Sequence, residues 1–289
     1  MSIAFLGIDK MGLPMSGHLA RAGHAVRAYD AAAGRLDLAA QAGVVPAASL
    51  AEAVGGADVI ISSLPNDAAL ESVAAQVCKA AARGAVYVDT SIVSLEASAR
   101  VAALCEAAGI DYLRLTVSGN NKMAEAANLT IMASGPRARF DALLPLFKTW
   151  GASRFYLGEG EQARLMKLVV NLMIVLTSTM LAEALTLGEK GGLDWRDMWS
   201  VITASAVGSP IVKAKSAQLV ERDFSPTFTV EQMQKDVSLI LGAGHQVGAP
   251  MLQAALATQA LEAAHAQGHA QEDYAAVIKV MENMAGLDG

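Results

Sequence analysis

The apolar and polar positions follow two successive patterns along the chain. Up to about residue 157, short apolar or β-branched runs alternate with alanine-rich helical runs, such as residues 14–22 and 35–42. The apolar runs predict strands at residues 2–6, 25–29, 58–62, 85–89, 110–115, 129–133 and 153–157. Strands that alternate with helices are typical of a parallel, doubly wound sheet in an α/β domain.

The second pattern begins near residue 162 and contains helices only. The predicted helices lie at residues 165–189, 194–204, 210–220, 230–246, 251–267 and 273–284. Glycine and proline turns separate them. We therefore predict an α/β domain at residues 1–162 and an all-α C-terminal domain at residues 163–289, joined by the long helix that starts at Leu165.

The composition indicates a compact protein that binds neither nucleic acid nor membrane. Hydrophobic residues make up 53% and charged residues 17% of the 289 positions, which is enough for a sizeable core. The net charge is −6, and no lysine or arginine cluster forms a nucleic-acid footprint. Residues 165–187 are apolar enough for a membrane helix, but they contain Lys167, Asn171 and Glu183 without flanking charges, which favours a buried helix.

The cysteines and the amino end indicate a cytoplasmic location. Cys78 and Cys105 each lie in an alanine-rich helical segment and do not form a disulfide framework. The chain opens as a strand without a basic segment before it, unlike a signal peptide. We expect a protein of the reducing cytoplasm.

One apolar helix carries a lysine and an asparagine at an unusual spacing. Lys167 and Asn171 are four residues apart, so they lie on one face of the helix, one turn apart. Burying an ammonium and an amide is costly unless they are paired or serve chemistry. A desolvated lysine can act as a base near neutral pH. The alternative is a lysine whose stem lies along the helix and whose charge reaches water.

The loop after the first strand has the form of a dinucleotide-binding fingerprint with one substitution. Its residues are Gly7, Ile8, Asp9, Lys10, Met11 and Gly12. The first glycine makes the tight turn, and the third allows helix and strand to pack. Asp9 replaces the second glycine and places a carboxylate where the backbone normally approaches the pyrophosphate. The alternative is a tight turn that binds no ligand.

The second strand ends in an acidic residue suited to a particular cofactor. Asp30 lies 23 residues after Gly7. An acid at this place binds the ribose 2′-OH of NAD and repels the 2′-phosphate of NADP. The sequence therefore predicts NAD in preference to NADP.

Taken together, these motifs resemble the β-hydroxyacid dehydrogenase family, which includes 3-hydroxyisobutyrate dehydrogenase and tartronate semialdehyde reductase. The resemblance extends over nearly the whole chain. The matching motifs, in family order, are residues 7–15, Leu64-Pro65, Asp89-Thr90-Ser91, Val117-Ser118-Gly119, the run from Gly160 through Lys167 to Asn171, and Lys235-Asp236. The resemblance implies a Rossmann-like first domain and a helical second domain.

The resemblance also implies an activity and a set of site residues. Hydride would pass between NAD and the hydroxyl-bearing carbon of a short β-hydroxy acid or its semialdehyde. Lys167 would be the general acid or base for the hydroxyl proton, and Asn171 would position the substrate. Further substrate contacts would come from Ser118, Gly119, Asn120 and Lys235. Cofactor contacts would come from the loop Gly7–Gly12 with Asp30, Leu64, Pro65, Ser91 and Lys235. No metal site is expected.

Several positions depart from the family pattern. Asp9 and Ile92, which stands where the family usually has a threonine, bear on cofactor affinity. Other departures lie in and before the substrate loop, at Arg114, Leu115, Thr116, Asn120, Asn121 and Lys122. We interpret these as facing a substrate that is more polar or larger than 3-hydroxyisobutyrate.

Two other functions remain open at this point. Imine or ketone reductases resemble this family but commonly lack the lysine that this chain has at position 167. A catalytically weak nucleotide-binding homologue is favoured by Asp9. With either function, the apolar helices of the second domain predict a homodimer or homotetramer.

Overall fold

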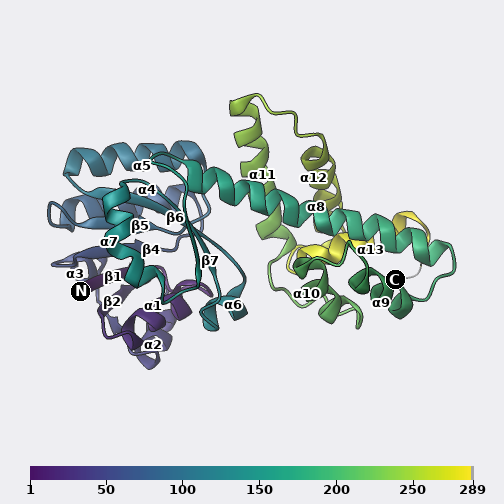
Figure 1. Ribbon diagram of the computed structural model, residues 1–289, viewed down its shortest axis with the longest axis horizontal. Helices are drawn as coiled ribbons and strands as arrows, with labels where there is room; N and C mark the ends of the chain where they lie inside the picture. The colour runs from purple at the N-terminus through teal and green to yellow at the C-terminus, as the bar shows by residue number, and fades with distance from the viewer. Residues whose placement is uncertain (288–289) are drawn as a thin grey trace. The chain divides into compact units, whose positions relative to one another are not determined.

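The computed structural model describes residues 1–287 and consists of two compact units, which divide between Lys167 and Leu168. The division lies within helix α8 (Gln162–Lys190), whereas the sequence analysis placed the boundary at the beginning of this helix, after residue 162. The first unit is α/β and the second is helical, so the predicted fold class is confirmed (Figure 1).

The first unit is built on one eight-stranded sheet in the order β3-β2-β1-β4-β5-β6-β7-β8. The strands are β1 (Ser2–Leu6), β2 (Ala25–Tyr29), β3 (Val45–Pro46), β4 (Val59–Ser62), β5 (Val86–Asp89), β6 (Asp111–Ser118), β7 (Thr130–Ser134) and β8 (Ser153–Tyr156). Only the β6–β7 pair is antiparallel among these strands. The sequence analysis missed β3, because it has two residues and one of them is a proline, which suits only an edge strand.

Helices cover both faces of this sheet. They are α1 (Gly12–Arg21), α2 (Ala33–Gln41), α3 (Leu50–Val54), α4 (Asp67–Ala80), α5 (Leu95–Ala108), α6 (Asn121–Glu125) and α7 (Arg137–Phe147). Several begin at a residue whose side chain accepts a first-turn amide, as Ser49, Asn66 and Ser94 do. These caps fix where the chain turns from strand to helix.

Alternation along the strands divides the interior of the first unit into two cores. Ile3 and Phe5 of β1 point to the face covered by α1, α2 and α7. Ala4 and Leu6 point to the opposite face, where α3, α4 and α5 pack. The period of two in a strand thus supplies both faces from one short apolar run.

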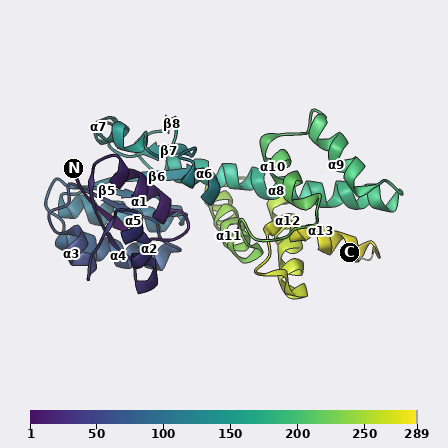
Figure 2. The ribbon, with the colours of Figure 1, turned by 90° about the horizontal axis from the view of Figure 1, so that it is seen from below.

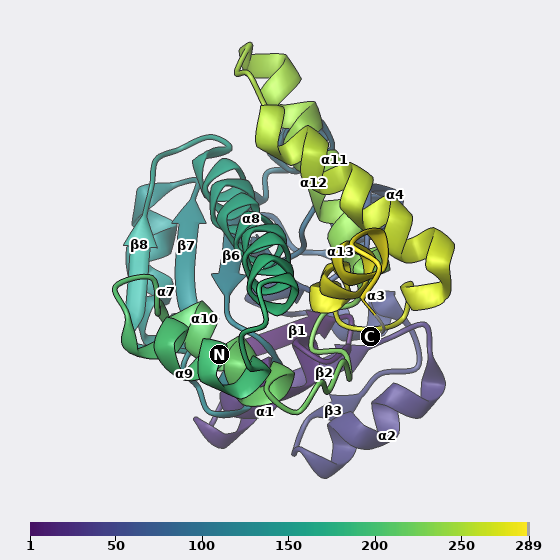
Figure 3. The ribbon, with the colours of Figure 1, turned by 90° about the vertical axis from the view of Figure 1, so that its right-hand side faces the viewer.

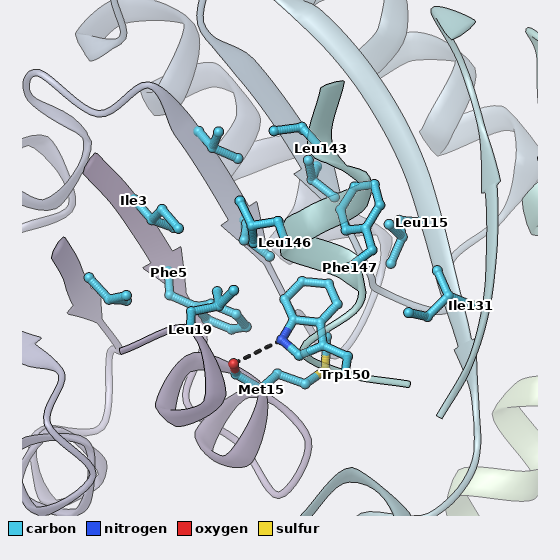
Figure 4. Close-up of a cluster of buried hydrophobic side chains, with 14 of the residues drawn as sticks. Ile3, Phe5, Met15, Leu19, Leu115, Ile131, Leu143, Leu146, Phe147 and Trp150 are labelled. Carbon is cyan, nitrogen blue, oxygen red and sulfur yellow. Dashed lines mark hydrogen bonds between the residues drawn. The ribbon is translucent and has the colours of Figure 1, made fainter. Parts of the chain in front are cut away.

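The core on the α1 and α7 side is centred on aromatic residues. Figure 4 shows Trp150 beside Phe147, with its indole N–H donating to the carbonyl oxygen of Met15 at 2.9 Å. The hydrogen bond satisfies the one polar atom of a fully buried side chain. Figure 2 shows α7 beside β7 and β8, which it contacts. Trp150 therefore ties α1 to the segment that follows α7.

In the second unit the described residues, up to Leu287, form helices and the turns between them, beginning with the second part of α8. The helices after α8 are α9 (Trp195–Ala204), α10 (Pro210–Leu219), α11 (Val230–Val247), α12 (Leu252–Ala264) and α13 (Val277–Met284), with a π-helical turn at His265–His269 and a 3₁₀ turn at Tyr274–Ala276. Helices α11 and α12 pack as an antiparallel pair (Figure 3). The predicted helix at 251–267 is α-helical only as far as Ala264 and continues as the π-helical turn, in which Gly268 has φ 93°.

A buried ion pair joins two segments of the second unit that are far apart in the sequence. The ammonium of Lys215 lies 2.5 Å from Asp273 and also donates to the hydroxyl of Thr227. Burial lowers the pKa of Lys215, and the Asp273 carboxylate opposes that shift. A buried charge requires such a partner, so this pair holds α10 to the turn before α13.

Helix α8 is long and apolar enough to cross a membrane, with a mean hydropathy of 1.9 in its most apolar 18-residue window. In the second unit its buried residues Val175, Leu181 and Leu185 belong to the hydrophobic core. In the first unit it carries the fully buried Arg164. We therefore interpret α8 as a core helix of a globular protein.

Candidate active site

The cofactor loop begins where the strand order reverses, between β1 and β4. Ligands of doubly wound sheets bind at such a point, at the carboxyl ends of the strands. Gly7 follows β1 with φ +94°, and a Cβ added to it would lie 2.1 Å from the carbonyl oxygen of Ser63. Only glycine fits there, which explains the first position of the fingerprint.

Asp9 engages the amides that open helix α1. Its Oδ1 accepts from the amide of Gly12 at 2.6 Å and from the amide of Met11 at 3.0 Å. The hydroxyl of Ser63, at the end of β4, also lies 3.3 Å from this oxygen. A helix N-terminus of this kind is where a diphosphate is normally bound. The carboxylate of Asp9 therefore takes the place of an anion in the loop.

Asp30 follows β2 and faces the same loop. Its Oδ2 accepts from the amide of Ile8 at 2.7 Å, and its Oδ1 accepts from the amide of Ala32 at 2.8 Å. Arg35 approaches to 3.4 Å, with a side chain that is about half exposed. A carboxylate has about four acceptor sites, so Asp30 can still accept hydroxyls of a ribose. The loop thus fits the adenosine half of a dinucleotide.

A wall of the cofactor site is formed where β4 and β5 end. The amide of Leu64 donates to the hydroxyl oxygen of Ser91 at 2.9 Å. The Ser91 hydroxyl in turn donates to Asp89 at 2.6 Å. Pro65 follows Leu64 directly, and Ile92 follows Ser91 as a buried residue. The predicted cofactor residues of the first unit therefore form one continuous set at the carboxyl edge of the sheet.

The substrate loop predicted from the sequence lies at the end of β6. Ser118 is the last residue of the strand. Gly119 has φ +141°, and a Cβ there would lie 2.7 Å from the side chain of Leu129. The Oδ1 of Asn120 accepts from the amide of Met123 at 3.0 Å and so caps α6. Asn120 thus shapes the loop through its carbonyl oxygen.

Two departures interpreted as substrate contacts have another role, so this part of the sequence interpretation was wrong. Arg114 donates to Glu161 through Nε at 2.8 Å and Nη2 at 2.5 Å. The hydroxyl of Thr116 donates to the carbonyl oxygen of Ala163 at 3.0 Å. These side chains alternate with Leu115 of the α7-side core and so point to the other face of β6. There they hold the beginning of α8.

Arg164 was not predicted from the sequence, and its side chain makes four hydrogen bonds near the site. Its guanidinium donates to Asp89, to the carbonyl oxygen of Ser91 at 2.5 Å, to the hydroxyl of Ser98 at 3.0 Å and to the hydroxyl of Tyr112 at 2.9 Å. Burial alone would lower the pKa of Arg164, but Tyr112 and Asp89 outweigh it and raise that pKa. The sequence signal for a buried role of Arg164 was an arginine within an apolar helix. This signal does not identify the partners of the side chain.

Lys167 is the last residue of the first unit and is 8% exposed. It follows Arg164 by three residues on α8, so the two share a face of the helix. Lys167 is thus a buried residue of this helix, and its role in catalysis stays a prediction.

Asn171 and Lys235 belong to the second unit, where a buried acid links them. The Nδ2 of Asn171 donates to Oδ2 of Asp236 at 2.6 Å. The ammonium of Lys235 lies 3.5 Å from Oδ1 of the same carboxylate. Asp236 is fully buried, on the face of α11 that also carries Met233 and Val237. No role was predicted for Asp236 from the sequence. The available signal was an acidic residue on an otherwise apolar face of a predicted helix.

A cavity and two histidines lie apart from the predicted site residues. A cavity of about 410 Å³ opens at the amino ends of the strands, among Met1, Asp58 and Arg139, at the opposite edge from Gly7. Within residues 1–287 no three His, Cys, Asp or Glu side chains are grouped to hold a metal ion. His265 contacts Gln234, and His269 contacts Glu272. The absence of a metal in the reaction stays a prediction.

Family models match both units. The NAD-binding domain of 6-phosphogluconate dehydrogenase matches residues 2–158. The NAD-binding domain of NADP-dependent 3-hydroxyisobutyrate dehydrogenase matches residues 161–281. A nicotinamide dinucleotide is therefore the cofactor class, as the geometry of Gly7 and Asp30 indicates.

Similar proteins are matched over nearly their whole length. The chain is 34% identical to 2-(hydroxymethyl)glutarate dehydrogenase of Eubacterium barkeri, over 99% of this chain and 97% of the relative. It is 31% identical to a solved 3-hydroxyisobutyrate dehydrogenase of Mycobacterium tuberculosis with L-serine, with a TM-score of 0.88, over 96% of this chain and 98% of that chain. An imine reductase from Streptomyces aurantiacus, at 21% identity over 97% of this chain and 99% of that chain and a TM-score of 0.65, shares the fold alone. The chain belongs to the β-hydroxyacid dehydrogenase family and is an NAD(P)-dependent oxidoreductase.

Proposed function

We propose that this protein is an NAD-dependent dehydrogenase of a short β-hydroxy acid, with Lys167 as its general acid and base. The observation that carries the proposal is the burial of Lys167 on α8, three residues after an arginine bonded to the cofactor wall. Burying an ammonium in a cofactor-binding unit is costly unless it is paired or serves chemistry. Oxidation of an alcohol requires a base at the hydroxyl.

The nicotinamide, when bound, supplies the hydride acceptor or donor, and the chain supplies placement and proton transfer. During oxidation the neutral amine of Lys167 removes the hydroxyl proton of the substrate. During reduction the ammonium returns a proton to the aldehyde oxygen. A group that takes and returns a proton in this way works best when its pKa lies near the working pH.

The substrate carboxylate is assigned to the loop after β6. Ser118 offers a hydroxyl at the end of the strand, and Gly119, which follows it, offers a backbone amide. Asn171 follows Lys167 by one turn of α8 and is the further substrate contact that the resemblance implies; its amide is oriented by the hydrogen bond to Asp236. The named acids of the relatives, 2-(hydroxymethyl)glutarate and 3-hydroxyisobutyrate, are the first substrates to try.

NAD is proposed in preference to NADP because of Asp30. A carboxylate at the end of β2 accepts ribose hydroxyls and repels a 2′-phosphate. Arg35 near Asp30 weakens that repulsion, since its guanidinium is 3.4 Å away. The preference therefore depends on the balance between these two side chains.

Turnover of short hydroxy acids and semialdehydes with each cofactor tests this function. A panel of hydroxy acids would be assayed with NAD and with NADP, following the absorbance of the reduced cofactor. Turnover with NAD that requires Lys167 supports the proposal. Turnover of imines but of no hydroxy acid would favour the imine reductase alternative instead.

A second function, nucleotide binding with little turnover, is favoured by the hydrogen bonds of Asp9. These bonds use two amides that a diphosphate would otherwise bind. Titration of the protein with NAD and NADH, followed by tryptophan fluorescence, separates the two. Tight binding without turnover of any panel member would favour this second function.

We also propose a cytoplasmic homodimer or homotetramer. Helix α8 carries an exposed apolar stripe at Met166, Val169, Met173, Met180 and Leu187. Their spacing places them within one narrow arc of the helix, and exposed stripes of this kind mark association surfaces. The cytoplasmic location rests on the sequence, which holds two cysteines and no disulfide framework.

A further inference from the structure

We infer that Arg164 is a positioning residue, which fixes the catalytic Lys167 at a set place relative to the wall of the cofactor site. The inference rests on the proposed role of Lys167. Its basis is a set of buried contacts, all within the first unit, that we name the α8 anchor: Arg164 with Asp89, Ser91, Ser98 and Tyr112.

The α8 anchor joins one helical turn to three neighbouring elements. Asp89 ends β5, Ser98 lies on α5 and Tyr112 lies on β6. A guanidinium has five N–H donors in a rigid plane, and four bonds to fixed partners determine both its position and its tilt. Because the side chain of Arg164 is 1% exposed, no water competes for these bonds.

The partner carboxylate is itself held on every side. Oδ1 of Asp89 accepts from the hydroxyls of Ser62 at 2.5 Å and Ser91 at 2.6 Å, while Oδ2 accepts from Arg164. Asp89 therefore cannot rotate without breaking bonds to β4 and to the loop after β5. The arginine is attached to a rigid point of the sheet.

The same network includes the cofactor wall. The hydroxyl of Ser91 donates to Asp89 and accepts from the amide of Leu64, and the carbonyl oxygen of Ser91 accepts from Arg164. Arg164 thus bonds directly to Ser91, which is one of the predicted cofactor contacts. Lys167 lies on the same face of α8 as Arg164, one turn on. Arg164 therefore joins the turn of α8 that carries Lys167 directly to the cofactor wall.

Neighbouring contacts fix the preceding turn but do not reach the cofactor wall. Glu161 pairs with Arg114, and the carbonyl oxygen of Ala163 accepts from Thr116. The hydroxyl of Ser134 donates to the carbonyl oxygen of Gly160 at 2.7 Å. These bonds hold the beginning of α8 in place when the anchor is weakened, so a conservative change at Arg164 should leave the fold intact.

Arg164→Lys tests the inference, because lysine keeps the charge but cannot make four bonds in one plane. We expect kcat to fall by about 10- to 100-fold, since a misplacement of ~1 Å costs on that order, while the dissociation constant of NADH changes little. Arg100→Lys is the matched control. Arg100 is an exposed residue of α5 that donates two hydrogen bonds to Glu71 of α4. Ser98→Ala removes one anchor bond and should lower kcat less than Arg164→Lys.

Two measurements do not depend on turnover. Hydrogen exchange of the amides at residues 163–168 should be faster in Arg164→Lys than in the wild type and in Arg100→Lys. Labelling of Lys167 by an amine-reactive reagent should also be faster. If the wild type turns over no hydroxy acid, the proposed function fails. The exchange and labelling rates then still show whether Arg164 holds this turn of α8 in place.

An unchanged kcat in Arg164→Lys, or exchange and labelling rates like those of the wild type, would overturn the inference. Equal losses of kcat and of NADH affinity would overturn it as well, because they would show that Arg164 supports the cofactor wall alone.

Discussion

The Oδ1 atom of Asp9 lies 2.6 Å from the amide nitrogen of Gly12 and accepts its hydrogen bond. The aspartate that replaces the second glycine of the dinucleotide fingerprint therefore has a structural role in the loop. Its carboxylate caps the first turn of α1 and presents a negative charge to the place of the diphosphate. A bound cofactor must either displace this carboxylate or share the amides with it.

Replacing Asp9 by glycine should therefore tighten cofactor binding. Removal of a like charge about 6 Å from a phosphate is worth about 3 kcal/mol at an effective dielectric constant of ~20, so Kd should fall by about 100-fold. Asp9→Asn, which keeps the cap and removes the charge, should give part of this gain. Fluorescence titration with NADH measures both. Unchanged or weaker binding by Asp9→Gly would show that the loop has adapted around the carboxylate.

Replacing Asp30 should shift the cofactor preference from NAD toward NADP. Asp30→Asn removes the charge that repels a 2′-phosphate, whereas Arg35→Ala removes the cation beside it and should shift the preference the other way. The ratio of kcat/KM for the two cofactors is the measurement. A wild-type enzyme that works equally well or better with NADP would refute the assignment of NAD.

Local pattern and long-range contact explain which features could be read from the sequence. The strands Ser2–Leu6 and Ala25–Tyr29 have the predicted bounds, because a buried parallel strand is a short apolar run and needs no partner to be recognised. Arg164 and Asp89 are 75 residues apart. Their pairing depends on the order of the strands in the sheet and on the direction of the side chains. The spacing of apolar residues along a short segment does not show either of these.

The same limit explains the error at Arg114 and Thr116. The family motif placed them beside the substrate loop, but the pleat of β6 turns them to the other face. Lys167 was predictable because helical spacing alone puts it with Asn171. Asp236 required knowledge of which helix packs beside Asn171 in the second unit.

Charge on the exposed stripe of α8 should weaken self-association. Met173 is 67% exposed and Met180 is 50% exposed, so Met173→Glu with Met180→Glu would place two carboxylates on a surface that we expect to be buried between copies. Sedimentation should show a smaller species. Leu38→Glu, at an exposed apolar position of α2, is the matched control. A wild-type protein that sediments as a monomer would contradict the proposed oligomer.

Asp236 and Asn171 should act as one unit on substrate binding. The amide of Asn171 is oriented by its hydrogen bond to the buried carboxylate, and a hydrogen bond to a charged group contributes about 1.5–3 kcal/mol. Asn171→Ala and Asp236→Ala should each raise KM, and the double variant should be little worse than either. Glu231→Ala, an exposed acid on the same helix, should leave KM unchanged. Additive effects on kcat/KM would mean that Asp236 does not work through Asn171.

Removal of the lysine amine should abolish most turnover while leaving the cofactor site intact. General acid and base groups contribute about 10²–10⁴-fold, so Lys167→Ala should lose kcat in that range without a matching change in the Kd of NADH. Lys167→Arg should be nearly as poor, because a guanidinium does not give up its proton. Lys190→Ala, at the exposed far end of the same helix, controls for the loss of a lysine from α8. If Lys167→Ala keeps more than about a tenth of the wild-type rate on the best substrate of the panel, the lysine is not the general acid and base by this yardstick, and the reductase or binding functions gain support.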